Sequence, residues 1–266
     1  MSDPAGTPAP AFDPTPPGHG RPAPPPERWW GNHLAEMRWQ AELARLLVDP
    51  VFRGEGVPRG DGGPVILIPG FLAGDASLSV MRGWLGRIGH DAHPSGMVAN
   101  VGCSDRIMQR LHARVVALHA RTGRRVAIVG HSRGGHFAKA LASRDPERVR
   151  AAVSIGAGLD TPFDISAPTQ AAVKAFRALY ARTSDRVERK GCFTETCRCA
   201  FTRDYAAVPP AEVPMTSIYS RGDGVVRWRA CIVDYATCVE VTGSHVGLAF
   251  NRKVYRVLAE ALAPAA

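Results

Sequence analysis

Short runs of branched apolar residues alternate with helical stretches along most of this chain. The clearest runs are Val65–Ile68, Val126–Val129 and Val149–Ile155, and two further candidates follow at Met215–Tyr219 and Cys238–Val241. A short, continuously apolar run is typical of a strand that is buried on both faces of a sheet. Because helical stretches separate the runs, the pattern predicts a mostly parallel sheet with right-handed crossovers and with helices on both faces.

The expected helices fill the gaps between these strands. They cover Ala76–Ile88, Asp105–Arg121, the segment from Gly134 to Ser143, and Gly247–Leu262. A further helix is expected at Trp29–Val48, where apolar residues recur at steps of three and four and so predict one packing face. That face consists of Trp30, Leu34, Met37, Ala41, Ala44 and Val48. We expect it to pack on the main domain.

The N-terminal segment before this helix has a different composition. Residues 1–26 are crowded with prolines and contain almost no core-forming residues. Such a segment cannot bury enough apolar surface to offset its ordering entropy, so we expect a disordered or polyproline-like tail. Residues 27–266 are then predicted to form a single domain.

One long stretch interrupts the alternation of strands and helices. Between Ile155 and Met215 the pattern shows one helix, Thr169–Ala181, and no convincing strand. An insertion that leaves one strand and returns before the next passes over the edge of the sheet where ligands bind, so we expect residues 158–214 to form a cap or lid. The apolar face of its helix would line an acyl pocket with Ala172, Val173, Phe176 and Leu179.

The segment that says most about chemistry is Val126–Gly135, which reads Val-Ala-Ile-Val-Gly-His-Ser-Arg-Gly-Gly. It places the pattern Gly-x-Ser-x-Gly between a buried strand and a helix, which is the context in which that pattern has a mechanism. The chain must turn sharply to present Ser132 at the tip, and glycines at the flanking positions let the backbone and the helix approach closely. The pattern predicts Ser132 as a nucleophile. The alternative is an ordinary strand–turn–helix corner with an incidental serine.

A serine hydroxyl is a weak nucleophile that needs a base, and the base needs an acid to orient it. Beyond Ser132 the chain has only two histidines, His136 and His245. His136 lies one turn further along the same helix and should point away from the turn. His245 lies in a loop of small residues after the last strand, at the edge where parallel sheets bind ligands, and is the predicted base.

The orienting acid should follow a strand between the nucleophile and the base. Asp223 fits best, because it lies in a glycine-flanked loop directly after Met215–Tyr219, and Asp160 is the rival. The resulting chain order of serine, aspartate and histidine differs from the orders of chymotrypsin-type and subtilisin-type enzymes.

Four segments together resemble the α/β-hydrolases, and in particular bacterial esterases and triacylglycerol-lipase-like serine hydrolases. They are Ile68–Phe71, Gly130–Gly134, Tyr219–Val226 and Gly243–Leu248. The resemblance implies an α/β-hydrolase fold and an oxyanion hole formed by the backbone N–H groups of Phe71 and Arg133. The chain has Pro69 where the family usually has a histidine. Because the oxyanion donor is a backbone group, this departure should not remove it.

The sequence therefore predicts an enzyme that cleaves carboxylic esters through a serine–histidine–aspartate triad and an acyl-enzyme, with no cofactor and no metal. Its expected partner is a small-molecule ester or lipid substrate. The predicted substrate-lining residues are His131, Leu72 and Phe176. Thioesterases and acyltransferases share this machinery, and a non-catalytic hydrolase-fold protein that binds an acidic partner is the competing class. The motifs leave acyl chain length and oligomeric state open.

Charge and hydropathy exclude two other classes of protein. The chain has 33 basic and 24 acidic residues, a net charge of +9. The basic residues are spread without the dense run or the interleaved aromatic residues of a nucleic-acid groove, so nucleic acid is not an expected partner. No apolar run approaches the roughly 18 to 20 residues of a membrane span, which argues against a transmembrane protein.

The N-terminus lacks the pattern of a secretory signal, which predicts a cytoplasmic protein with reduced thiols. Three of the 6 cysteines, Cys192, Cys197 and Cys199, lie close together in the insertion. Their spacing is a poor match to a structural zinc site. One or two disulfides are the alternative to plain thiols, and oxidation would pin the tip of the insertion.

Overall fold

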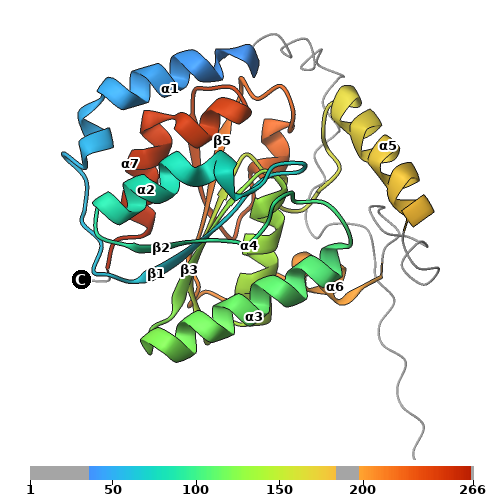
Figure 1. The fold of residues 1–266 in the computed structure, drawn as a ribbon, viewed down its shortest axis with the longest axis horizontal. Coiled ribbons are helices and arrows are strands. Elements are labelled where there is room, and N and C mark those ends of the chain that lie inside the picture. The colour runs from blue at the N-terminus through green and yellow to red at the C-terminus, as the bar shows by residue number, and fades with distance from the viewer. Residues whose placement is uncertain (1–35, 184–197, 265–266) are drawn as a thin grey trace, which may run out of the picture.

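The computed structural model describes residues 36–183 and 198–264. A sheet forms the centre of this part of the chain (Figure 1). It has six strands, and each runs parallel to its neighbours in the order β2-β1-β3-β4-β5-β6. The strands are β1 (Pro64–Ile68), β2 (Asp91–Pro94), β3 (Val126–His131), β4 (Val149–Ile155), β5 (Met215–Ser220) and β6 (Thr237–Val241). The prediction of a parallel sheet is confirmed, and all of the predicted strands are present.

Helices cover both faces of the sheet through two apolar clusters. The first cluster joins α1 (Trp39–Val48), α2 (Ser79–Arg87) and α7 (Arg252–Ala261) to one face. The second joins α3 (Ser104–Thr122), α4 (Arg133–Arg144) and α6 (Ala200–Ala206) to the other. Successive residues of β1 enter the two clusters in turn, because successive side chains of a strand point to opposite faces. The remaining helix, α5 (Ala167–Thr183), lies to one side of these layers (Figure 1).

Strand β2 and helix α6 were missing from the sequence prediction, and the last helix was predicted too long. Strand β2 reads Asp-Ala-His-Pro and is half-buried at the edge of the sheet, so it lacks the apolar signal of the central strands. Helix α6 has only 7 residues. The expected helix Gly247–Leu262 is divided into a 3-10 helix, Val246–Phe250, and α7, because the Asn251 side chain caps α7 by accepting from the N–H of Lys253.

The packing face predicted for the N-terminal helix is wrong where the structure describes it. Met37 is 67% exposed and Val48 is 77% exposed, whereas Leu46 is fully buried. Trp39 and Leu43 are partly buried beside Leu46, and the regular helix begins at Trp39 after a 3-10 turn. The predicted contact between this helix and the domain is present, but through a different side of the helix.

Some predictions fall on residues outside the described ranges. These are the proline-rich tail at residues 1–26, the start of the N-terminal helix with Trp30 and Leu34, and the cysteines Cys192 and Cys197. Among the described cysteines, Cys103, Cys231 and Cys238 are free thiols. None of the described helices is long and apolar enough to cross a membrane.

Candidate active site

Ser132 lies in the sharp turn between β3 and α4, in a backbone conformation that residues with a side chain rarely adopt. Its φ of 52° and ψ of −127° make it one of two described non-glycine residues with positive φ. The Ser132 N–H donates to Ile155 O on the neighbouring strand β4 at 2.8 Å, and Ser132 O accepts from Gly135 N at 2.8 Å. Strained backbone of this kind is held only where its surroundings fix it, and it concentrates at functional sites.

The glycines on either side of Ser132 make this turn possible. A side chain at Gly130 would collide with the backbone of Gly134, and one at Gly134 would collide with the carbonyl of Ile68 on β1. Helix α4 therefore starts in direct contact with two strands. The close approach that the sequence pattern predicts is present in the structure.

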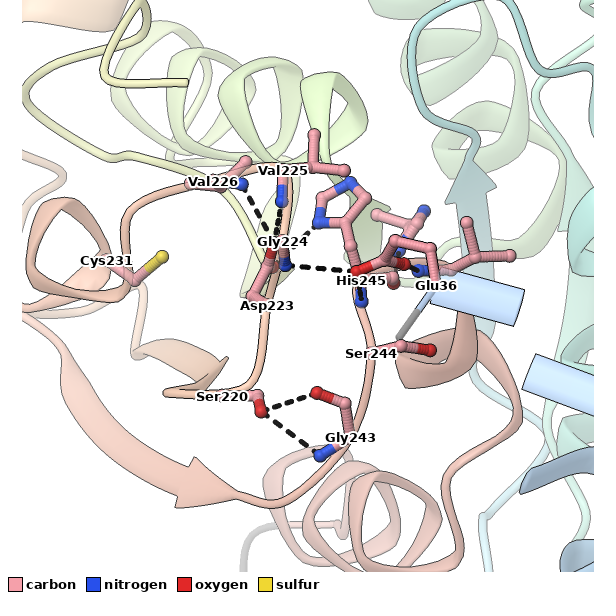
Figure 2. Close-up of polar contacts among 12 residues, drawn as sticks. Glu36, Ser220, Asp223, Gly224, Val225, Val226, Cys231, Gly243, Ser244 and His245 are labelled. Atoms are coloured by element: carbon pink, nitrogen blue, oxygen red, sulfur yellow. Dashed lines mark hydrogen bonds and ion pairs between the residues drawn. The ribbon is translucent and has the colours of Figure 1, made fainter. Parts of the chain in front are cut away.

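His245 and Asp223 meet at the carboxyl ends of β6 and β5. Their side chains are buried, and His245 Nδ1 lies 2.7 Å from Asp223 Oδ2 (Figure 2). The other carboxylate oxygen, Asp223 Oδ1, accepts from the N–H groups of Val225 and Val226, each at 2.8 Å. These bonds fix the carboxylate, so that it holds Nδ1–H on the imidazole and leaves Nε2 as the basic nitrogen.

The backbone at the end of β4 lies next to this pair. Gly156 follows β4 with φ +61°, and a side chain there would lie about 3 Å from Asp223 Oδ2 and His245 Nδ1. A side chain would crowd the pair, and the positive φ favours glycine at this position. Four consecutive strands of the sheet, β3 to β6, thus bring Ser132, Asp223 and His245 to one edge.

The electrostatic surroundings favour a protonatable His245. Burial lowers the pKa of His245, but the charge and hydrogen bond of Asp223, together with the charge of Glu36, outweigh burial and raise it above 6.5. The neighbouring His131 behaves in the opposite way. Burial and the nearby His245 lower its pKa to about 4, so His131 is neutral near pH 7.

The rival residues of the sequence analysis lie elsewhere. Asp160 accepts from Lys139 Nζ at 3.0 Å and from the Tyr235 hydroxyl at 2.6 Å, in a buried lysine's ion pair on the α4 face of the sheet. His136 packs edge-on against Tyr205 of α6, with ring centroids 5.3 Å apart. Neither is a partner of the Asp223–His245 pair.

The loop that carries Phe71 lies directly against the Ser132 turn. A side chain at Gly70 would approach Ser132 Cβ to 3.0 Å. The guanidinium of Arg133, the first residue of α4, donates to Asn100 O at 3.0 Å and to Gly102 O at 3.0 Å. Asn100 in turn donates through its side chain to Pro69 O at 2.7 Å. The two backbone groups assigned to the oxyanion hole therefore belong to segments that one hydrogen-bond network joins.

The three residues predicted to line the substrate pocket have different surroundings. His131 is buried, and its Nε2–H donates to the backbone carbonyl of His245 at 2.9 Å, which makes it a support for the base loop. Leu72 is 56% exposed beside Phe71. Phe176 of α5 packs edge-on against Phe71, with ring centroids 5.9 Å apart. Helix α5 thus contacts the Phe71 loop, although Ala172 and Leu179 of its predicted apolar face are exposed.

Comparison with known proteins agrees with this architecture. A family model for the α/β-hydrolase fold matches residues 99–197 of the chain. A Bacillus licheniformis lipase in its mature form superimposes with a TM-score of 0.54 at 15% identity, covering 79% of this chain and 95% of that one. The chain has the α/β-hydrolase fold.

Two further α/β-hydrolase structures are similar. A soluble variant of monoglyceride lipase from Saccharomyces cerevisiae has a TM-score of 0.52 at 14% identity, and covers 78% of this chain and 86% of its own. A Paleococcus ferrophilus monoacylglycerol lipase has a TM-score of 0.51 at 13% identity, with 77% and 96% covered. No curated protein matches the chain in sequence. The predicted α/β-hydrolase fold is confirmed.

Sequence reasoning missed several residues that hold this site together. Asn100 is fully buried and joins Arg133 to the Phe71 loop, and Glu36 and Glu42 contact the loop that carries His245. The side chains of all three bind backbone groups. Every residue type has such groups, so the sequence does not show which segments these side chains bind. Among the described residues, no group of three or more histidine, cysteine or acidic side chains could hold a metal ion.

Proposed function

We propose that this α/β-hydrolase cleaves carboxylic esters by nucleophilic catalysis at Ser132. The Ser132 hydroxyl attacks the ester carbonyl while His245 Nε2 takes its proton, and the C–O bond of the resulting tetrahedral intermediate breaks as His245 returns that proton to the leaving alcohol. Water, deprotonated by His245, then hydrolyses the acyl-enzyme and releases the acid. Asp223 holds the tautomer and stabilises the imidazolium ion.

The observation that carries the proposal is the shared edge of the sheet. A serine with strained backbone follows β3, and a buried histidine–aspartate pair joins the loops after β6 and β5. The ring of His131, the residue before Ser132, lies 5.0 Å from the ring of His245, centroid to centroid. Within the described residues no hydrogen bond joins Ser132 to His245. Hydrogen bonds of this kind often tighten only when substrate binds.

The oxyanion would be held by the N–H groups of Phe71 and Arg133. The amides of the first turn of a helix point out of its N-terminus, so α4 offers its positive end to a charge that develops beside Ser132. Arg133 also fixes the Phe71 loop through Asn100 and Gly102. We assign the acyl side of the pocket to α5, because Phe176 contacts Phe71.

The test is hydrolysis of p-nitrophenyl esters from acetate to palmitate by the full chain. Ser132→Ala should lower kcat by about a million-fold, as the loss of a nucleophile does in a comparable triad, without loss of fold. Ser143→Ala, on the same helix, is the matched control and should keep wild-type activity. The proposal fails if the wild type hydrolyses none of the esters, or if Ser132→Ala retains activity within tenfold of wild type.

A further inference from the structure

The two loops that carry Asp223 and His245 are joined by a carboxylate from the N-terminal segment. Glu36 Oε1 accepts from the N–H of Gly224 at 3.0 Å and from the N–H of His245 at 2.9 Å (Figure 2). Its second oxygen, Oε2, accepts from the N–H of Val246 at 3.0 Å. One side chain therefore binds the residue after the acid, the base itself and the residue after the base.

A second carboxylate supports the same loop one residue earlier. Glu42 of α1 accepts from Ser244 N at 2.9 Å and from the Ser244 hydroxyl at 2.8 Å. The loop is shaped around this side chain, since a side chain at Gly247 would collide with Glu42 Oε2. Hydrogen bonds from N–H groups to a carboxylate are roughly twice as strong as those between neutral groups.

We propose that Glu36 and Glu42 are positioning residues of the active site, which fix the His245 loop against the Asp223 loop from outside the sheet. The inference rests on the proposed function, because the loops they join carry the base and its orienting acid. Both glutamates bind backbone N–H groups, and Glu42 also binds the Ser244 hydroxyl, so they act on the loops rather than on the side chains of the triad. Their effect is therefore expected on the geometry and the proton affinity of His245.

The proposal accounts for the two acidic residues on the buried side of this segment. Trp39, Leu43 and Leu46 pack there as an apolar stripe, and Glu36 and Glu42 are partly buried as well, whereas Met37 and Val48 are exposed. The side of the segment that faces the domain thus includes both acidic residues. Packing alone does not require carboxylates there, whereas the backbone N–H groups of the buried residues Gly224, Ser244 and His245 do require acceptors.

Glu36 also changes the electrostatics of the base. Among the described residues, the titratable groups that face His245 are Asp223 after β5, His131 at the end of β3 and Glu36 before α1. His131 is neutral near pH 7, so the two carboxylates supply the charge. Removing the charge of Glu36 should lower the pKa of His245 and move the acid limb of kcat/KM to lower pH.

The experiment compares Glu36→Ala, Glu36→Gln and Glu42→Ala in the full chain, with Gln40→Ala as the matched control from the exposed side of α1. Glu36→Ala should lower kcat/KM by about a hundredfold, mostly in kcat, as expected for misplacement of a catalytic group by about 1 Å. Glu36→Gln keeps the oxygen that serves Gly224 and His245, so it should recover part of the rate while its acid limb stays shifted. Gln40→Ala should match wild type in both respects.

A double-mutant cycle tests the fit around Glu42. Gly247→Ala should lower activity in the wild-type background, because the added methyl group displaces Glu42. In the Glu42→Ala background the same change should cost less, because the nearest atom to the added carbon is then the Ser244 hydroxyl oxygen, at 2.6 Å. Additive effects of the two changes would overturn the part of the proposal that concerns Glu42.

The His245 titration, followed by NMR of its imidazole protons, separates this proposal from the proposed function. If the wild type neither hydrolyses esters nor reacts at Ser132, the function fails, and a lowered His245 pKa in Glu36→Gln still supports the positioning role. Wild-type rates and an unshifted acid limb in both Glu36 variants would overturn it. Loss of rate in proportion to loss of Tm, with an unshifted pKa, would also overturn it, because that pattern marks a merely structural residue.

Discussion

At the scale of single residues, the site depends on the hydrogen bonds that the carboxylate of Asp223 accepts. Asp223 has one oxygen bound to two backbone N–H groups and the other bound to His245 Nδ1. Asp160 also accepts two hydrogen bonds, but from Lys139 and Tyr235. Two aspartates that both follow a strand thus have different tasks, and their hydrogen-bond partners distinguish them.

This difference predicts the outcome of two matched substitutions. Asp223→Asn should lower kcat by roughly ten-thousand-fold, because an amide in that place favours the wrong tautomer of His245. Asp160→Asn should leave kcat close to wild type, and its effect should appear in Tm, since it weakens the ion pair of Lys139. Steady-state kinetics on one ester measures both. The reverse order of effects on kcat would move the acid to Asp160.

The buried His131 predicts how stability depends on pH. Its pKa of about 4 in the folded protein lies below the ordinary value of 6.5, so the unfolded chain binds more protons between these values. The free energy of unfolding should therefore fall as the pH is lowered from 7 to 4, with about 3 kcal/mol of the loss due to His131. The raised pKa of His245 acts in the opposite direction. Urea unfolding across this range should show a shallower fall in His131→Gln; an unchanged slope would contradict the assignment.

At the scale of elements, the sequence predicts the strands that are continuous and apolar. The central strands and the Ser132 turn follow from runs such as Val126–Val129 and from the glycines beside the serine. Strand β2 could not be found this way, because an edge strand reading Asp-Ala-His-Pro has no apolar pattern. The face of α1 was misassigned because Trp39, Leu43 and Leu46 recur at the same steps of three and four residues as the predicted stripe, so periodicity alone does not choose between the two. A hydrophobic pattern also cannot show that the carboxylates of Glu36 and Glu42 bind a distant backbone.

The proposed role of helix α5 depends on one contact with the Phe71 loop. Phe176 packs on Phe71, beside the Ser132 turn. Phe176→Ala should alter the ranking of long against short acyl esters, because it enlarges the space next to the oxyanion loop, while the reactivity of Ser132 stays largely intact. Lys174→Ala, an exposed position on the same helix, is the control. A chain-length profile identical to that of wild type would show that α5 has no part in selectivity.

At the scale of the whole molecule, the three proposed catalytic residues follow strands at one edge of the sheet, and two of the side chains that bind their loops, Glu36 and Glu42, come from outside the sheet. The segment before α1 contributes Glu36, so the chain ahead of β1 belongs to the site although it lies outside the sheet. This arrangement could not be read from the sequence, since its contacts join residues separated by most of the chain. We assign no role in the site to the proline-rich residues 1–26.

Deleting residues 1–26 should leave kcat and Tm nearly unchanged, because a proline-rich tail makes few packed contacts. The deletion retains Glu36 and Glu42, so the positions of both active-site loops should be kept. Thermal unfolding and ester hydrolysis of the shortened chain measure this directly. A drop of several degrees in Tm would show that the tail docks on the domain.

The central claim is that Ser132 is an activated nucleophile, and a fluorophosphonate probe tests it most directly. The probe forms a covalent bond only with a serine whose proton is taken by a base, and peptide mass mapping locates the adduct. The account predicts a single adduct on Ser132 in the wild type, none in Ser132→Ala and strongly reduced labelling in His245→Ala. A wild-type protein without an adduct, or an adduct that persists in Ser132→Ala, would contradict the account.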